Sequence, residues 1–343
     1  MILITGGSGF LGINIVRQFL KRDESVRVFD LVDIDKDVKK DVDFVKGSIT
    51  NYNLVRELCK DVDIVYHTVA SLPIAKAGMN YIKVNVKGTY NILQSAYESG
   101  VKRFIHISTS AMYGAPTEKQ CPINEESPFY PLGHYGKSKS IGEGWCRKYR
   151  EFGLNVSIVR PRAIIGKERL GIFQILFDWI RRGKKIYIIG NGENLCQFLH
   201  IDDLVDACIK LKKHGAFEDF NIGTDKFNTI GKDLNSLIKH AKTKAKLVPV
   251  NPFIAKNSLF ILDKLKLSPF VDWHYLTFDN PFYFDVSKAK KMLKWGPKYS
   301  NAKMLCDAYD WYIEHRKKAD TTMGVTHRKG LNQGILKLLR WIS

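Results

Sequence analysis

The chain has 343 residues, 45% of them hydrophobic, and a formal net charge of +19. Its length and composition predict one or two globular domains around a large core, and no apolar run approaches the roughly 18 residues that a membrane-spanning helix needs. The excess of positive charge suits a polyanionic partner, but the charge is spread along the chain without a recognised nucleic-acid module. This favours a solvated basic surface over nucleic-acid binding.

The first predicted elements are a buried strand and a helix joined by a glycine-rich turn. Residues 1–4 read Met-Ile-Leu-Ile, and residues 5–12 read Thr-Gly-Gly-Ser-Gly-Phe-Leu-Gly. Gly6, Gly9 and Gly12 would let the backbone turn tightly, approach a pyrophosphate and pack the helix against the strand, with the helix N-terminus facing the phosphates. The sequence therefore predicts a dinucleotide site. Cleavage of a leader would destroy it, so we expect no signal peptide.

The second predicted strand covers residues 26–29 and runs into Asp30. An acidic residue about 20 positions beyond such glycines is placed to accept hydrogen bonds from the adenosine ribose hydroxyls. Its negative charge would repel the 2′-phosphate of NADP. Asp30 therefore favours NAD as the cofactor.

Short apolar strands then alternate with amphipathic stretches. Strands are expected at 42–44, 64–66, 104–107, 156–159 and 198–200, and helices near 51–59, 80–99 and 136–152. This alternation predicts an α/β fold with a doubly wound parallel sheet. From about residue 160 the pattern is less regular, and a smaller lobe is expected to close over a substrate at the carboxyl ends of the strands. The expected parts are a cofactor-binding domain (1–162, with returning segments near 197–222), a mainly substrate-binding lobe (163–315) and a basic tail (316–343).

The candidate catalytic residues are Thr109, Tyr135 and Lys139. Residues four apart share a helix face, so the Tyr135 phenol and the Lys139 ammonium can face one pocket. A nearby cation would lower the pKa of the phenol, which could then exchange a proton with a substrate hydroxyl while hydride moves to nicotinamide. Upstream, the strand at 104–107 runs into Ser-Thr-Ser. We expect the Thr109 hydroxyl to bind the same substrate oxygen.

In this order the motifs resemble the extended short-chain dehydrogenase/reductases, the NAD-dependent epimerase/dehydratase family, over roughly residues 1–315. The GxxGxxG spacing fits this superfamily, and further matches lie at 85–91, 160–161, 198–204, 220–223, 285–287, 293–297 and 311–312. The resemblance implies a Rossmann fold and a set of further cofactor contacts. These are Phe10 and Leu11 beside the pyrophosphate, Ser48 and Ile49 near the adenine, Val69, Ala70 and Ser71 near the nicotinamide ribose, and Asn85, Tyr135 and Lys139.

The chain departs from the family's pattern in the expected substrate pocket. Dehydratases of the family carry Asp-Glu directly after the catalytic threonine, where this chain has Ser110 and Ala111, which argues against 4,6-dehydration. Enzymes acting on nucleotide sugars usually carry an Asn and an Arg where this chain has Ala163 and Gln197. A substrate diphosphate could instead be met by Arg162, Lys167, Arg169 or the pair Arg181 and Arg182.

The tail, residues 316–343, holds seven Lys or Arg against one acid, Asp320. Apolar residues recur in it at helical spacing, at Leu331, Ile335, Leu338, Leu339 and Ile342. Such a helix could dock on the protein body or on a second subunit, or it could make peripheral membrane contact with anionic lipid.

The leading functional hypothesis is an NAD-dependent sugar-nucleotide epimerase, with a UDP-sugar as substrate and a keto intermediate. The alternative is an NAD-dependent dehydrogenase or reductase of a lipid-like or steroid-like alcohol. A non-catalytic NAD-sensing protein is disfavoured by the intact Thr109, Tyr135 and Lys139. We expect no metal, a cytoplasmic location, and reduced thiols, since the six cysteines are scattered. The resemblance implies a homodimer formed through the helices near 80–99 and 136–152.

Overall fold

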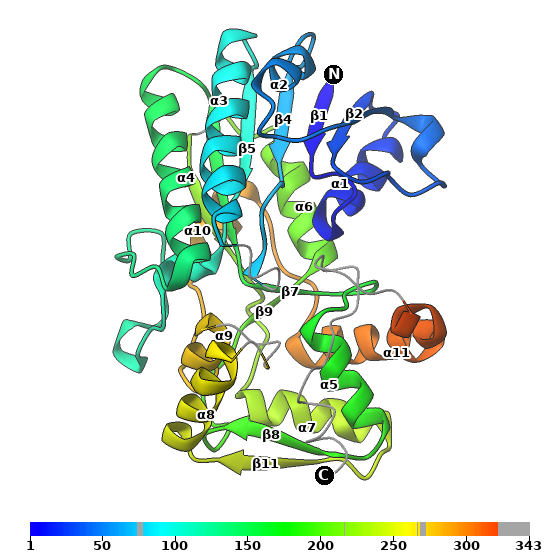
Figure 1. The fold of residues 1–343 in the computed structure, drawn as a ribbon, viewed down its shortest axis with the longest axis vertical. Helices are drawn as coiled ribbons and strands as arrows, with labels where there is room; N and C mark the ends of the chain where they lie inside the picture. The colour runs from blue at the N-terminus through cyan, green and yellow to red at the C-terminus, as the bar shows by residue number, and fades with distance from the viewer. Residues whose placement is uncertain (74–77, 216, 266, 268–271, 322–343) are drawn as a thin grey trace.

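The computed structural model describes residues 1–73, 78–215, 217–265, 267 and 272–321 (Figure 1). Figure 1 shows one part built on a large sheet with helices on both of its faces, and a lobe of helices and short strands beneath it. The expected amphipathic segment at 331–342 lies outside the described residues.

The large sheet has seven parallel strands in the order β10-β6-β5-β4-β1-β2-β3. These strands are β1 (Ile2–Thr5), β2 (Val26–Asp30), β3 (Asp43–Lys46), β4 (Ile64–His67), β5 (Arg103–Ile107), β6 (Val156–Pro161) and β10 (Asp219–Ile222). In the register, Thr5 lies opposite His67, and His67 lies opposite His106. Because all strands run the same way, the segments that follow them emerge at the same end of the sheet, the carboxyl ends of the strands. The predicted doubly wound parallel sheet is confirmed.

Alternate residues of the interior strand β1 enter two separate cores. Ile4 joins a cluster with Val16 and Leu204, whereas Leu3 joins a cluster with Val55 on the other face. All four residues of β1 are buried, as expected for a strand covered on both faces. The flanking helices are α1 (Phe10–Leu20), α2 (Tyr52–Leu58), α3 (Thr89–Glu98), α4 (Gly133–Glu151), α6 (Ile201–Leu211) and α10 (Ser287–Leu293).

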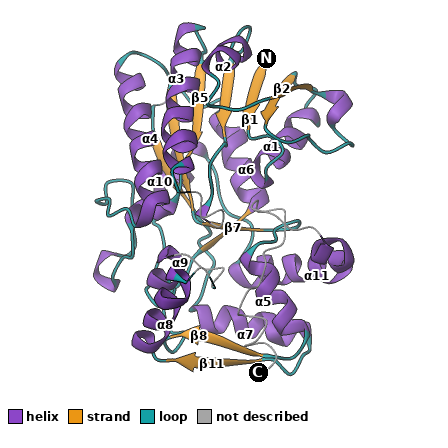
Figure 2. Ribbon diagram, viewed as in Figure 1, coloured by secondary structure: helices purple, strands orange, loops and turns teal. Residues whose placement is uncertain are grey.

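The lobe has a third hydrophobic core and two small parallel sheets, β7 with β9 and β8 with β11 (Figure 2). Phe177, Leu237 and Tyr312 meet in this core. Its elements are β7 (Ala163–Ile165), α5 (Ile172–Arg181), β8 (Lys185–Ile189), β9 (Phe198–His200), α7 (Ile230–Ala241), β11 (Lys246–Val250), α8 (Pro252–Lys264), α9 (Asp272–Thr277) and α11 (Asn301–Thr321).

The predicted elements match the observed ones with a few differences. The stretch 80–99 is a π-helical segment, Tyr81–Gly88, followed directly by α3. The helix expected from 136 begins at Gly133. Strands β7, β8, β10 and β11 were not among the expected strands, because each is short and pairs with a segment distant in sequence. All six cysteines are free thiols, and no helix in the described ranges is long and apolar enough to cross a bilayer.

Candidate active site

The glycine-rich turn brings the backbone of β1 and α1 into close contact. Gly6 has φ +77°, and a Cβ on Gly12 would lie 2.1 Å from the Gly6 carbonyl oxygen, so neither position accepts a side chain. The Gly9 N–H donates to that same oxygen at 3.0 Å. No side chain caps the N-terminus of α1, which begins at Phe10. The first N–H groups of α1 therefore suit an anion such as a pyrophosphate.

Asp30 lies at the carboxyl end of β2, beside this turn. Its Oδ2 accepts from the Ser8 N–H at 3.0 Å and its Oδ1 accepts from the Val32 N–H at 3.2 Å. Burial raises the pKa of Asp30, opposed by these backbone hydrogen bonds. A carboxylate has about four acceptor sites, so the ribose hydroxyls expected there could still bind it. The turn and Asp30 together fit NAD.

Ser48 and Ile49 follow β3. The Ser48 hydroxyl lies 2.8 Å from the Thr50 hydroxyl, and the Ile49 carbonyl accepts from the Asn91 amide at 3.0 Å. The Ile49 side chain belongs to the core on the α2 and α3 side of the sheet. If adenine binds here, it would therefore contact the backbone of Ser48 and Ile49 and not the Ile49 side chain.

Asn85, in the π-helical segment, ties the loop after β4 to helix α4. Its Oδ1 accepts from the Ser71 N–H at 2.7 Å, and its Nδ2 donates to the Ser71 carbonyl and, at 2.9 Å, to the Ser138 hydroxyl. The Ser138 hydroxyl in turn donates to the Tyr135 carbonyl at 2.8 Å. Asn85 therefore positions two predicted parts of the site, the loop at Val69–Ser71 and the start of α4, relative to each other.

Thr109, Tyr135 and Lys139 come together at the carboxyl end of β5. The Thr109 side chain hydrogen-bonds to the Tyr135 phenol, and its oxygen also accepts from the Ala111 N–H at 3.2 Å. Lys139 is buried, and its Nζ donates to the Ile107 carbonyl oxygen at 2.7 Å. Burial lowers the pKa of Lys139 to about 8, which still leaves the amine mostly protonated at pH 7.

The expected low pKa of Tyr135 is wrong for the protein without cofactor. Burial raises the pKa of Tyr135 to about 12, and the hydrogen bond with Thr109 opposes the rise only in part. The Lys139 ammonium is directed to the Ile107 carbonyl and does not offset the burial of the phenol. The ring of Tyr81 lies edge-on to Tyr135, with centroids 6.3 Å apart.

Two buried histidines, which the sequence interpretation did not include, lie behind Lys139. His106 Nε2 is 3.3 Å from Lys139 Nζ, and the rings of His67 and His106 lie 5.4 Å apart on paired positions of β4 and β5. Burial lowers the pKa of His67 to about 3, so it is neutral at pH 7. The signal in the sequence is the alternation within 104–107, which puts Phe104 and His106 on the face that α4 covers.

The expected substrate residues Ser110 and Arg162 are in direct contact. Arg162 follows β6, and its Nη1 donates to the Ser110 hydroxyl oxygen at 3.2 Å. Its Nε donates to the Gln197 carbonyl at 3.1 Å, and its guanidinium stacks on the Phe282 ring, 3.7 Å from the centroid. Ala163 is half-buried at the start of β7, opposite Phe198 of β9.

The expected substrate contact of the Gln197 side chain is corrected by the structure. Gln197 is 0% exposed, and its amide donates to the carbonyls of Thr224 and Phe284 and accepts from the Phe284 N–H at 2.9 Å. A Cβ on Gly223 would lie 2.4 Å from this amide. With both of its groups occupied, the Gln197 side chain holds together two backbone segments, at Thr224 and at Phe284.

The other expected phosphate ligands differ in their partners. Arg181 and Arg182 both pair with Asp178 of α5, which partly neutralises them. Arg169 is buried near Phe10 at the start of α1, and its Nη1 has no hydrogen-bond partner among the described residues. Arg169 therefore remains available to an anion, whereas the pair on α5 is already occupied.

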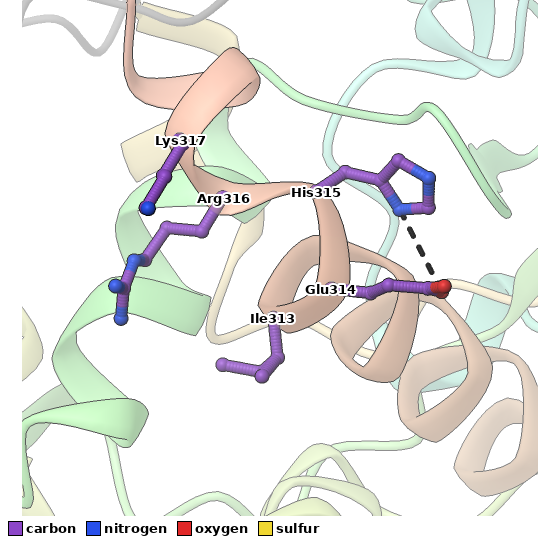
Figure 3. A pocket seen from close by; sticks show the side chains of 5 residues that line it. All are labelled: Ile313, Glu314, His315, Arg316 and Lys317. Carbon is purple, nitrogen blue, oxygen red and sulfur yellow. Dashed lines mark ion pairs between the residues drawn. The ribbon is translucent and has the colours of Figure 1, made fainter.

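Figure 3 shows a surface hollow lined by five consecutive residues of α11, from Ile313 to Lys317. Glu314 and His315 lie 3.7 Å apart there. In Figure 1, α11 and α4, the helix that carries Tyr135 and Lys139, lie on opposite sides of the view. No cluster of metal-ligating side chains occurs within the described part of the chain.

Comparisons with known proteins place this geometry in a family. A curated relative, the uncharacterised protein y4nG of Sinorhizobium fredii, is 38% identical over 98% of this chain and 85% of its own length. The UDP-glucose 4-epimerase of Thermotoga maritima, solved with UDP-glucose, shares the fold with a TM-score of 0.77 at 24% identity, over 92% of this chain and 99% of that one. The UDP-glucuronic acid 4-epimerase of Bacillus cereus, solved with NAD, gives 0.72 at 23% identity, over 91% and 98%.

Residues 2–223 match the NAD dependent epimerase/dehydratase family, a stretch that includes the glycine-rich turn, Asp30, Thr109, Tyr135, Lys139 and Arg162. The structure shows the fold expected from that resemblance, a parallel sheet with the turn between β1 and α1 and with helix α4 against the sheet. The chain therefore belongs to the NAD dependent epimerase/dehydratase family and is an NAD-dependent enzyme of the extended short-chain dehydrogenase/reductase type.

Proposed function

We propose that the protein is a UDP-sugar 4-epimerase that oxidises and re-reduces the C4 carbinol of the sugar. The observation that carries this proposal is the hydrogen-bonded pair Thr109 and Tyr135 beside the buried Lys139, with no acid at Ser110 or Ala111. The absence of that acid pair is the chemical reason to favour epimerisation over dehydration. The carbon and the nucleotide are carried over from the named activities of the T. maritima and B. cereus structures.

In this mechanism Tyr135 is the proton acceptor and donor. Its ionised phenol takes the proton of the C4 hydroxyl, and Thr109 donates a hydrogen bond to the same oxygen as the carbonyl forms. NAD, when bound, would supply the acceptor and donor for the C4 hydride. Once the keto sugar had turned over and been re-reduced on its other face, Tyr135 would give the proton back. Gly6, Gly9, Gly12 and Asp30 would hold the cofactor.

The direct test uses purified protein and UDP-sugars with no added cofactor. We expect NAD to remain bound and the 4-epimer to appear without net NADH. If NADH accumulates only with an apolar alcohol, the protein is instead the dehydrogenase of a lipid-like alcohol. The charge of Arg162, which no acid of the described residues balances beside Ser110, disfavours that alternative.

Tyr135→Phe should lower turnover by about 100- to 10,000-fold and leave NAD binding intact, because it removes only the phenolic proton carrier. Tyr187→Phe, which changes a 43% exposed tyrosine in β8 on the lobe, is the control and should have normal activity. Full activity of the Tyr135 variant would remove this residue from the mechanism.

We also propose a homodimer that forms through α3 and α4. The apolar side chains of Tyr97, Ile141 and Phe152 are each close to half exposed on these helices, and the rings of Tyr97 and Phe152 lie 6.1 Å apart. Light scattering of the full chain should give twice the mass of one chain, and Ile141→Asp should shift it to the monomer. An unchanged mass for the variant would place the interface elsewhere.

A further inference from the structure

Arg162 is a buried cation without a buried anion beside it. Its residue is 3% exposed, and the groups that it contacts are neutral: the Gln197 carbonyl, the Ser110 hydroxyl and the Cys196 thiol. No ion pair joins it to an Asp or Glu in the part of the chain that the structure describes. Burial lowers the pKa of Arg162 to about 10, which leaves the guanidinium charged at neutral pH.

Arg160, two residues earlier, shows how this fold neutralises a buried arginine. Its Nε and Nη2 donate to the two carboxylate oxygens of Glu143 at 2.9 and 2.8 Å, and it also pairs with Asp219. A buried charge costs several kcal/mol unless it is paired, because water no longer solvates it. The hydrogen bonds of Arg162 orient its guanidinium but leave its charge uncompensated. A bound anion would neutralise this charge.

The position of Arg162 shows which anion of a substrate it can reach. Strands β5 and β6 are adjacent and parallel, so Ser110 and Arg162 lie together beyond their carboxyl ends. Ser110 follows Thr109, the residue that hydrogen-bonds to Tyr135. In a hexopyranose, C4 is bonded to C5, which carries C6, whereas C1 with its diphosphate lies across the ring. An oxyanion close to the group that binds the C4 oxygen is therefore one on C6.

Resting on the epimerase function proposed above, we infer that Arg162 and Ser110 bind a carboxylate at C6 of the sugar, so that the substrate is a nucleotide-linked hexuronate. Arg162 supplies the positive charge and its planar N–H donors. Ser110 accepts one hydrogen bond from Arg162, which leaves its own O–H to donate to the carboxylate. The diphosphate is the competing source of negative charge, and the test separates the two.

The experiment compares UDP-glucuronate with UDP-glucose, which differ only at C6, on the NAD-loaded full-length enzyme. We expect the wild type to favour UDP-glucuronate in kcat/KM, and Arg162→Met to lower this value by about 10- to 100-fold while changing that for UDP-glucose less than about threefold. Arg162→Lys should keep part of the preference, because it retains the charge but not the fork of donors. Arg22→Met, which removes an exposed guanidinium in the turn that follows α1, is the matched control.

Equal losses with both sugars would overturn the inference and assign Arg162 to the diphosphate, and so would a wild type that prefers UDP-glucose. If neither sugar is epimerised, the proposed function fails, but binding still tests Arg162. Calorimetry should then give tighter binding of UDP-glucuronate than of UDP-glucose to the wild type, and equal binding of both to Arg162→Met. Equal binding to the wild type would refute the carboxylate site whatever the reaction is.

Discussion

The carboxyl ends of β1 and β6 build the active site in opposite ways. At β1 the site consists of backbone, because Gly6 and Gly12 have no room for a side chain. At β6 it depends on a buried charged side chain, Arg162, which no acid in the described part of the chain neutralises, whereas Arg160 within the strand is neutralised by Glu143 and Asp219. The first end offers the uncapped N–H groups of α1 to a diphosphate, whereas the second offers a guanidinium whose charge no acid of the described residues balances. The difference suggests that the cofactor site is fixed by the fold and that specificity depends on the side chains near β6.

The strongest test of the β1 end is Gly12→Ala. The new Cβ would lie 2.1 Å from a backbone oxygen, so α1 must move away from the turn. We expect loss of bound NAD, measured by absorbance of the purified protein, and a lower melting temperature. Gly144→Ala in α4 is the matched control, since its Cβ meets nothing within 4 Å and alanine favours a helix. Retention of NAD by Gly12→Ala would show that the turn is not the cofactor site.

At the β6 end, Arg160→Met should lower the free energy of unfolding by about 3 kcal/mol. The substitution leaves Glu143 buried, with Arg147 as its remaining partner at 2.9 Å. Urea denaturation of the variant and of Glu143→Gln/Arg160→Met would check the cause. The double variant should recover part of the loss, because it removes both charges. No recovery would mean that packing, not charge, dominates at this strand.

Tyr135 lies on α4 and belongs to neither the β1 end nor the β6 end. The titration of its phenol tests how far the site depends on bound cofactor. In the cofactor-free protein the phenol should ionise at a pH of about 12, two units above an ordinary tyrosine, because burial disfavours the phenolate. The absorbance change on ionisation, taken as the difference between wild type and Tyr135→Phe, measures this. The NAD-loaded protein should titrate at a lower pH, since the reaction needs the phenolate near neutrality. A midpoint near 10 without cofactor would contradict the burial of the phenol.

The smallest expected effect is that of Arg162→Met on stability. Removal of an uncompensated buried charge favours folding, while loss of the hydrogen bonds to Ser110 and the Gln197 carbonyl opposes it. We expect the free energy of unfolding to change by less than about 1 kcal/mol. Urea denaturation beside Arg160→Met makes the comparison direct. A loss as large as that of Arg160→Met would mean that Arg162 is part of the folded framework and not a ligand site.

The sequence allowed the β1 end to be predicted because its chemistry is local. Glycines at fixed spacing, an apolar strand and Asp30 lie within one β-α-β unit, and the tyrosine and lysine of α4 are four residues apart. These features depend on backbone geometry that residue types report directly.

The β6 end could not be predicted in the same way, because its partners are distant in sequence. Arg160 is neutralised by Asp219, and Gln197 is held by the backbone of Phe284. A single sequence does not show that backbone groups would occupy the amide of Gln197, or that His106 would lie against Lys139. The spacing of Tyr135 and Lys139 predicts too low a pKa for the phenol for a related reason, since it shows that a cation is near but not that the Ile107 carbonyl holds it.

Strand β10 has a consequence for how the protein is made. Its Asp219 pairs with Arg160, and the strand lies at the edge of the large sheet beside β6. During synthesis the sheet is therefore completed only when about 60 residues beyond β6 have been made. A nascent or truncated chain that ends near residue 162 would carry β6 as an open edge, a template for pairing with other chains. The smallest soluble fragment with the cofactor site should therefore extend past Ile222, and shorter fragments should aggregate during expression.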